Sequence, residues 1–404
     1  MPWKELSKVE LRKDFAQAVL VDGVPLAEAC RQHGISRPTG YKWLRRYEAG
    51  GVAGLSDHSR APRVVANRTP GDVEEAIVQL RGRYPSFGPK KLKALLEKRA
   101  PGGDWPTVST IGAILERRGL VEPRETRRRT PASTAPLSHA RQPNDVWSVD
   151  FKGQFLLGNG RLCYPFTVTD NASRMLLAVD SYPSTKGEPV RRTMERLFTE
   201  HGLPTAIRSD NGSPFASPGV LGLSTLSAWW LSVGVAHERI EVGHPEQNGR
   251  HERMHLTLKQ ETTRPAAADF DGQQRRFDRF RAFYNDERPH EALGQEPPAS
   301  AWAPSVRRYP DDVVSPDYSR CDLVRSVSRG GAIKFSKNEL FLSTALAGHS
   351  VGLTEIDVDV WLVAFVGLEL GLFEPGDSRV APFSVGRRTA RDADGGADTE
   401  DPEV

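Results

Sequence analysis

Cysteine is nearly absent from this 404-residue chain, which has three cysteines, at positions 30, 163 and 321. They lie far apart and form no C-x-x-C pair, which excludes a disulfide scaffold and gives no support for a cysteine-based zinc site. Long apolar runs are also missing, because the longest, around 360–373, is interrupted by Glu369 and two glycines. A membrane span needs ~20 apolar residues. The first residues, MPWKELSKVELRK, contain no apolar stretch typical of a secretion signal. We therefore expect a cytoplasmic protein with no membrane partner.

Basic and acidic residues are nearly balanced over the whole chain but unevenly distributed along it. The 55 Lys and Arg residues and 52 Asp and Glu residues leave a net charge of +3. Residues 1–143 hold 26 basic and 15 acidic residues, residues 144–305 hold 18 and 20, and residues 306–404 hold 11 and 17. A basic front end favours a polyanionic partner, most simply nucleic acid, although a solvated surface would have the same composition.

The first 62 residues have the pattern of a helix-turn-helix unit. Residues 8–47 read as three short helices, with Gly34 at a tight turn and Ser36 as the N-cap of the third helix. We expect an apolar interior formed by Ala27, Cys30, Ile35, Trp43 and Leu44. The third helix would then present polar side chains to the major groove of DNA, namely Arg37, Thr39, Lys42, Arg45 and Arg46. A plain three-helix bundle with a basic face is the alternative.

Two further segments precede the first strands. Apolar spacings of three and four predict three helices in residues 66–123, which we interpret as a second DNA-binding helical domain. Residues 124–143 then read as a basic linker, whose Arg127, Arg128 and Arg129 can lie along phosphates.

An α/β pattern begins at residue 144. Strands are predicted at 146–157, 163–169, 175–180, 205–209 and 237–240, with helices interspersed and two more closing the segment at 249–262 and 273–285. A domain over 144–305 with a mixed five-stranded sheet follows from this order. Short strand-like segments then predict a small β-barrel over 306–388, and residues 389–404 form an acidic tail that we expect to be disordered.

Three carboxylates of the α/β region occupy positions where they could meet. Asp150 lies in the first strand, Asp210 ends the fourth, and Glu252 opens a helix. Clustered carboxylates raise one another's pKa unless cations neutralise them. Mg²⁺ prefers carboxylate oxygens, water and phosphate oxygens, so phosphodiester transfer is the expected chemistry.

Four motifs around these acids resemble one family. They are WSVDF, GLPTAIRSDNGSPF, HPEQNGRHERMHLTLKQE and YNDERPHEAL. In this order they are similar to the integrase-type core of DDE transposases, above all those of bacterial insertion sequences. The resemblance implies an RNase-H-like fold with Asp150, Asp210 and Glu252 as the metal-binding catalytic triad. It also implies two Mg²⁺ ions, both bridged by Asp150, with Mn²⁺ able to substitute.

Several readings of the third motif stay open. The interval from Asp210 to Glu252 is longer than is usual in integrases, so Glu246 or Glu241 could be the third acid. Glu252 is preferred because it follows the Asn-Gly pair by three residues, as the family pattern requires. Residues 251–255 also match the H-E-x-x-H pattern of zinc peptidases. Lys259 lies two helical turns beyond Glu252 and could hold a DNA phosphate.

The resemblance implies the following function. The N-terminal units would bind the terminal inverted repeats of the protein's own element, and the core would cleave DNA and transfer the strand to target DNA. Because two element ends must be held together, at least a dimer is expected on double-stranded DNA. The protein would be associated with the bacterial nucleoid. The C-terminal domain would assist assembly or contact target DNA. A catalytically silent DNA-binding regulator of the same descent is the alternative.

Overall fold

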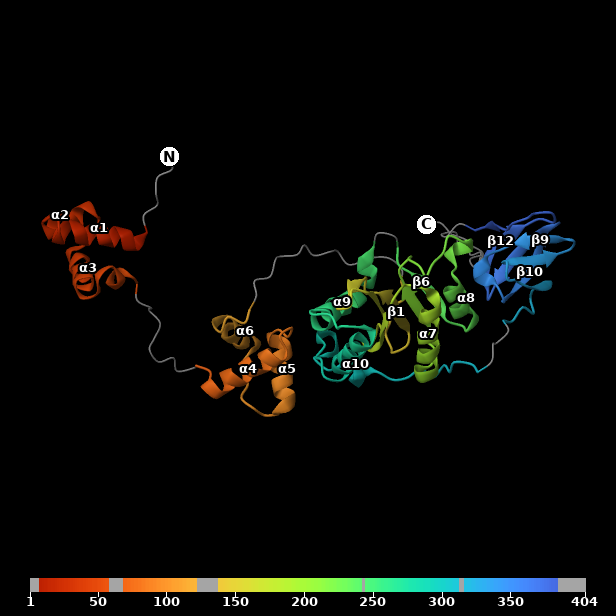
Figure 1. Cartoon of the computed structure of the whole chain (residues 1–404), viewed down its shortest axis with the longest axis horizontal. Coiled ribbons are helices and arrows are strands. Elements are labelled where there is room, and N and C mark those ends of the chain that lie inside the picture. The colour runs from red at the N-terminus through yellow and green to blue at the C-terminus, as the bar shows by residue number, and fades with distance from the viewer. Residues whose placement is uncertain (1–6, 58–67, 122–136, 242–243, 312–315, 384–404) are drawn as a thin grey trace, which may run out of the picture. The chain divides into compact units, whose positions relative to one another are not determined.

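The computed structural model describes residues 7–57, 68–121, 137–241, 244–311 and 316–383 (Figure 1). The chain divides into two units, Met1–Pro70 and Gly71–Val404. The linker arginines 127–129 and the acidic tail at 389–404 lie outside the described residues. Within the described part of the chain, no helix has both the length and the apolar character needed to cross a bilayer.

The first unit is a helix-turn-helix domain. It consists of α1 (Lys8–Leu20), α2 (Leu26–Gln32), α3 (Arg37–Gly50) and a 3₁₀ turn at Gly51–Leu55. As predicted, Gly34 has a positive φ at the turn, and the Ser36 hydroxyl accepts a hydrogen bond from the backbone N–H of Thr39. Ala27 is only half-buried. The buried alanine of α2 is Ala29 and not Ala27 as expected, because Ala29 lies on the same helix face as Leu26 and Cys30.

The second unit begins with another three-helix group. It comprises α4 (Gly71–Arg83), α5 (Pro89–Arg99) and α6 (Val108–Arg117). Its core contains the predicted apolar positions of all three helices, Ile77, Leu80, Leu92, Leu95, Leu96, Ile111, Ile114 and Leu115. Glu74 is buried and forms ion pairs with Arg117 (2.6 Å) and Arg118 (3.4 Å) across this group.

A mixed sheet forms the centre of the second unit. Its strands are β1 (Val146–Phe151), β2 (Phe155–Leu156), β3 (Leu162–Asp170), β4 (Leu176–Tyr182), β5 (Ala206–Ser209) and β6 (Ala236–Arg239). β1 pairs antiparallel with β3 and parallel with β5, β5 pairs parallel with β6, and β3 pairs antiparallel with β4. The sheet therefore has six strands rather than the five expected, because the predicted first strand is interrupted before Phe155, where Gly153 has a φ of 75°.

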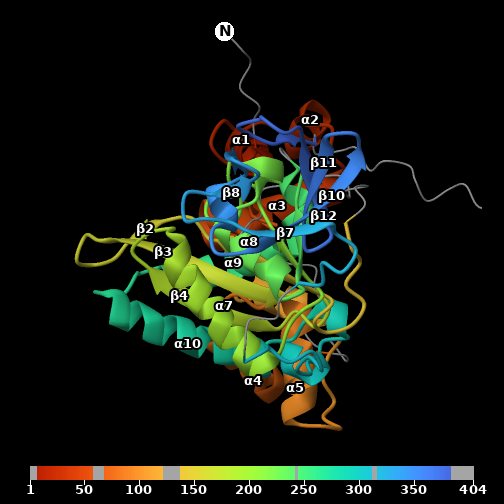
Figure 2. The same ribbon diagram turned by 90° about the vertical axis from the view of Figure 1, so that its right-hand side faces the viewer.

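Helices cover both faces of this sheet, as in an RNase-H-like fold (Figure 1). α7 (Gly187–His201) and α8 (Thr225–Ser232) pack on the face that carries Trp147, Val149 and Phe166. α9 (Gly249–Thr262) and α10 (Phe270–Asp286) pack on the other face, with α10 running beside β4 (Figure 2). Since strand residues alternate between faces, Ser148 and Asp150 point to the side of α9.

The C-terminal segment is a β structure without a closed barrel among its described residues. Its strands are β7 (Leu323–Ser326), β8 (Ala332–Phe335), β9 (Asn338–Phe341), β10 (Ser350–Asp357), β11 (Val360–Phe365), β12 (Leu368–Phe373) and β13 (Ala381–Pro382). The antiparallel sheet has the order β13-β12-β11-β10-β7, and β8 and β9 form a separate hairpin. β7 and β13 are the two ends of that order, so the sheet stays open rather than closing as predicted. The two sheets share one apolar core.

Candidate active site

The two aspartates lie at corresponding points of two parallel strands. Val146, Trp147 and Ser148 of β1 pair with Ala206, Ile207 and Arg208 of β5. Two residues further along, the same register would set Asp150 opposite Asp210, which directly follows β5. Because parallel strands end at the same edge of a sheet, both carboxylates leave the sheet at one edge. Asp210 follows the last residue of its strand, and its carboxylate accepts a hydrogen bond from the Gly212 N–H (3.0 Å).

Glu252 joins this pair from the first turn of α9, where its side chain is exposed. The pKa of Asp150 is raised to about 7, first by burial, then by the negative charges of Asp210 and Glu252. The three carboxylates thus interact electrostatically at one site. A buried carboxyl whose pKa is raised beside two further carboxylates fits a site for a divalent cation.

The choice of Glu252 over Glu246 and Glu241 as the third acid stays a prediction, although Glu252 is among the charges that act on Asp150. The side chain of the alternative Glu246 lies outside what the structure describes, and Glu241 is exposed in the segment after β6. Lys259 is exposed on α9, two turns from Glu252 on the same side of the helix.

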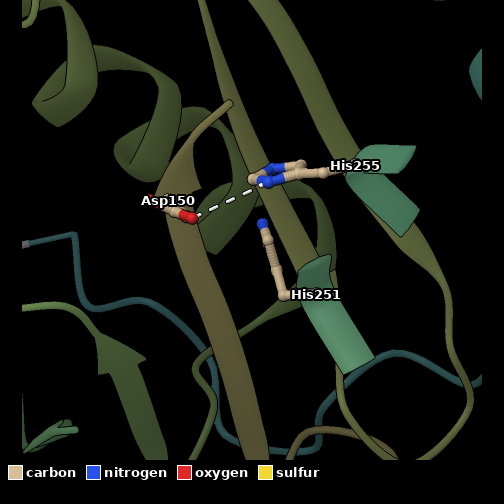
Figure 3. Close-up of side chains that lie close together, drawn as sticks. All are labelled: Asp150, His251 and His255. Atoms are coloured by element: carbon tan, nitrogen blue, oxygen red, sulfur yellow. Dashed lines mark ion pairs between the residues drawn. The ribbon is translucent and has the colours of Figure 1, made fainter. Parts of the chain in front are cut away.

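Two buried histidines of α9 lie under Asp150 (Figure 3). His255 Nδ1 is 3.7 Å from Asp150 Oδ2, and one ligand atom from each of Asp150, His251 and His255 lies within 4.8 Å of the others. Burial lowers the pKa of His251 to about 3 and that of His255 well below its ordinary value, because burial disfavours the charged imidazolium.

Threonine hydroxyls of β3 hold both imidazole rings. The Thr167 hydroxyl lies 2.7 Å from Nε2 of His251 and 2.7 Å from Nε2 of His255, and it donates to the backbone oxygen of Asp150 (3.1 Å). The Thr169 hydroxyl lies 2.7 Å from Nδ1 of His251. Both nitrogens of His251 are therefore engaged and Glu252 faces solvent, an arrangement unlike that of an H-E-x-x-H zinc peptidase, in which both histidines bind the metal.

Other polar residues of the motifs have structural contacts. The buried Asp170 carboxylate accepts hydrogen bonds from the backbone N–H groups of Asn144, Ala172 and Ser173, which fixes the turn into β4. The Asn285 side chain bonds both backbone groups of Leu176 and so ties α10 to β4.

The predicted DNA-facing residues of α3 lie on one polar surface. Arg37, Lys42 and Arg45 are exposed, whereas Thr39 and Arg46 are half-buried. Lys42 and Arg46 lie 4.9 and 5.1 Å from the centre of the Trp43 ring, and Arg12 of α1 lies 3.7 Å from it, so three cations surround one aromatic ring.

Sequence reasoning missed three residues of these sites. Tyr41 is an aromatic residue on α3 that is 54% exposed, among the basic residues. Thr167 and Thr169 were not singled out, although their i, i+2 spacing in a strand places them on the face that carries α9. That spacing was the only signal for them in the sequence.

Family models match most of the regions described above. Models described as "Integrase core domain" match residues 140–245 and 233–298. A "Helix-turn-helix domain" model matches residues 11–63, and a "Homeodomain-like domain" model matches residues 39–115. These matches cover the N-terminal helices, the central sheet and α9, and so include all three carboxylates.

Proteins of two bacterial insertion elements are similar to the chain over most of its length. The 39.2 kDa protein of insertion element IS476 from Xanthomonas euvesicatoria is 27% identical over 284 residues, which is 69% of this chain and 78% of that protein. The 31.7 kDa protein of insertion element IS407 from Burkholderia multivorans is 28% identical over 280 residues, which is 67% of this chain and 88% of that protein.

Among solved structures, the HTLV-2 integrase catalytic core domain in complex with magnesium has a TM-score of 0.33 and 14% identity, over 40% of this chain and 99% of that chain. The integrase-core matches identify the catalytic part as a polynucleotidyl transferase, and the helix-turn-helix matches account for DNA binding. With the two insertion-element relatives, these matches support a transposase of the bacterial insertion-sequence type, which binds DNA and integrates it.

Proposed function

We propose that Asp150, Asp210 and Glu252 are the catalytic triad of this transposase. One observation carries the proposal: the shared register of β1 and β5 brings Asp150 and Asp210 to one sheet edge, where Glu252 also acts on the pKa of Asp150. The packing of three acids at the end of a sheet costs free energy unless a cation offsets their repulsion. That cost is difficult to explain for residues with only a structural role.

The three carboxylates would hold two Mg²⁺ ions, with Mn²⁺ as a substitute. Bound cations would neutralise the carboxylates and stabilise the charge that develops on the phosphate oxygens. The residues of this chain position the DNA: Lys259, on the same side of α9 as Glu252, would hold a phosphate beside the triad.

The reaction would consist of two in-line displacements at phosphorus. In the first, water attacks the phosphodiester at each end of the element and the 3′-oxygen leaves as a hydroxyl. In the second, that 3′-hydroxyl attacks a phosphodiester of target DNA, and the leaving oxygen is the new 3′-end of the cut target. Neither step forms a covalent bond to the enzyme.

Recognition of the element ends would lie in the N-terminal helices. The α3 residues Arg37, Thr39, Lys42, Arg45 and Arg46 would read and position the terminal inverted repeats, and the basic segment 124–143 with Arg127, Arg128 and Arg129 would follow the phosphates. Two ends must be held together, so at least a dimer would act on DNA. The C-terminal β domain would support assembly or target contact.

The test is a cleavage and strand-transfer assay on DNA that spans the ends of the element encoding this chain. The variants Asp150→Asn, Asp210→Asn and Glu252→Gln should each bind that DNA and lose joined products by about a thousandfold or more, because each removes a charge that acts in the transition state. Asp271→Asn is the matched control, since it removes an exposed carboxylate of α10 and should leave the yield unchanged.

The outcomes separate the readings. Joined products from all three triad variants would overturn the assignment of the triad. DNA binding without cleavage by the unaltered chain, at every Mg²⁺ and Mn²⁺ concentration, would instead indicate the catalytically silent regulator.

A further inference from the structure

His255 is the neighbour of Asp150 for which the proposed reaction has no role. Its side chain is 7% exposed, and Nδ1 faces Asp150 Oδ2 at 3.7 Å (Figure 3). That distance is too long for a hydrogen bond. The approach of these two atoms therefore needs an explanation other than a hydrogen bond between them.

The hydroxyl of Thr167 decides where the protons of His255 lie. A hydroxyl donates one proton and accepts two hydrogen bonds. Its three contacts are the Asp150 backbone oxygen, which only accepts, and Nε2 of both histidines. All three contacts are satisfied only if Thr167 donates to the Asp150 oxygen and each Nε2 donates to Thr167. His255 then has a proton on Nε2, and Nδ1 is the nitrogen that can present a lone pair.

The same assignment of protons leaves His251 with both ring nitrogens in hydrogen bonds. With its proton on Nε2, the Nδ1 lone pair of His251 accepts from the Thr169 hydroxyl at 2.7 Å. His251 therefore has no unused nitrogen, whereas His255 has one, and that one faces the carboxylate.

A nitrogen lone pair and a carboxylate oxygen both donate electrons. Two such atoms face each other in this way when they bind the same cation. Divalent ions such as Mg²⁺ and Zn²⁺ bind nitrogen and oxygen ligands at roughly 2.0–2.2 Å. Two ligand atoms of one such ion can therefore be up to about 4.4 Å apart. The 3.7 Å between His255 Nδ1 and Asp150 Oδ2 lies within that span.

We propose that His255 Nδ1 is a ligand, together with Asp150, of one divalent cation of the catalytic site. This rests on the proposed function, in which Asp150 binds metal. The site then combines a nitrogen donor with carboxylate oxygens. Imidazole suits transition metals, whereas Mg²⁺ prefers oxygen ligands only. The ion at Asp150 is thus better served by Mn²⁺ than by Mg²⁺, and Zn²⁺ competes for the position.

The first test is pulsed EPR of Mn²⁺ bound to the tag-free full chain without DNA, at less than one equivalent. Electron spin echo modulation should show coupling to a ¹⁴N nucleus, and protein labelled with ¹⁵N-histidine should show the ¹⁵N pattern in its place. This measurement needs no variant, so it decides the question even if substitutions at His255 prevent folding. Bound Mn²⁺ without nitrogen modulation would overturn the ligand role of His255 and leave the triad assignment standing.

The second test compares His255→Gln with the unaltered chain. A glutamine amide N–H can replace Nε2 as the donor to Thr167, but the amide offers no nitrogen lone pair in place of Nδ1, so the ¹⁴N modulation should be lost. We expect Mn²⁺ affinity to fall about tenfold or more and Mg²⁺ affinity to change less than about threefold. His139→Gln, at an exposed histidine, is the control and should keep both the affinity and the modulation.

Asp150→Asn separates failure of the ligand role from failure of the proposed function. If that variant binds Mn²⁺ as the unaltered chain does, the metal is not at Asp150, and both the triad and the role of His255 are wrong. If Asp150→Asn loses Mn²⁺ while His255→Gln keeps both the modulation and the affinity, only the role of His255 is wrong.

Discussion

One hydroxyl group, that of Thr167, supports the buried side of the active site. It is fully buried and contacts the backbone oxygen of Asp150 and both histidines of α9. Thr167→Val keeps the shape of the side chain and leaves two buried Nε2–H groups without an acceptor. Since each unmet group costs about 1–3 kcal/mol, we expect the free energy of unfolding of the catalytic core to fall by roughly 2–5 kcal/mol.

Thr169→Val is the matched control, because it leaves only Nδ1 of His251 without a donor. Its cost should be about 1–3 kcal/mol. Calorimetry of the full chain, which resolves the transition of the core, measures both variants. An equal cost for the two substitutions would contradict the shared role of Thr167.

A second residue, His237, gives the core a pH dependence. Its Nε2 lies 2.8 Å from the Ser209 hydroxyl, and burial, with a smaller effect of Arg239, lowers its pKa to about 3. The unfolded chain binds a proton at the ordinary pKa of about 6.5. Between these values only the unfolded state is protonated, so acidification favours unfolding, by at most about 1.4 kcal/mol per pH unit for one group.

His237→Gln removes this contribution but keeps a polar group near Ser209. We expect the free energy of unfolding of the variant to depend on pH less steeply, by about 1 kcal/mol per pH unit between roughly pH 6 and 4. Denaturant titrations of both proteins at several pH values measure the slopes. Parallel slopes would show that His237 is not the buried neutral group described here.

At the scale of elements, the close approach of α3 to α1 and α2 depends on Gly40. A Cβ at this position would lie 2.6 Å from Cys30 Sγ and 3.0 Å from Phe15 Cζ. Gly40→Ala should therefore force α3 away from its neighbours and cost about 1–3 kcal/mol. Because α3 carries the basic surface, affinity for DNA of the element ends should fall as well.

Gly50→Ala is the control at the end of the same helix, since a Cβ there meets nothing within 4 Å. Circular dichroism melting and fluorescence anisotropy with labelled DNA compare the two variants. Equal melting temperatures and equal affinities would show that Gly40 does not set the position of α3.

The sequence predicted elements better than it predicted contacts between them. α9 begins and ends at Gly249 and Thr262 as expected, because its polar and apolar residues alternate with helical periodicity. The contact between Asp150 and His255 could not be predicted, since it depends on how α9 packs on β1. The open C-terminal sheet was missed for a related reason: alternation identifies strands, but not whether the first and last strands pair.

At the scale of the whole second unit, the long interval between Asp210 and Glu252 joins two domains of the chain. A 3₁₀ turn at Val220–Gly222 lies in this interval, and Leu223 and Ala228 belong to the apolar core of the C-terminal sheets. The extra residues thus pack into the apolar core of the C-terminal sheets instead of forming a free loop. This explains why they can be present without displacing β5 from β1, on which the positions of both aspartates depend.

Leu223 is 5% exposed, so its truncation should leave a cavity in that shared core. We expect Leu223→Ala to lower the free energy of unfolding by about 2–4 kcal/mol and to make the C-terminal segment more susceptible to limited proteolysis. Val306→Ala, at a residue that is 97% exposed, is the control. If both variants release the C-terminal fragment at the rate of the unaltered chain, the interval does not anchor this domain. Faster release in Leu223→Ala alone would mean that the catalytic domain stabilises the C-terminal domain, because Leu223 and Ala228 complete the apolar core of its two sheets.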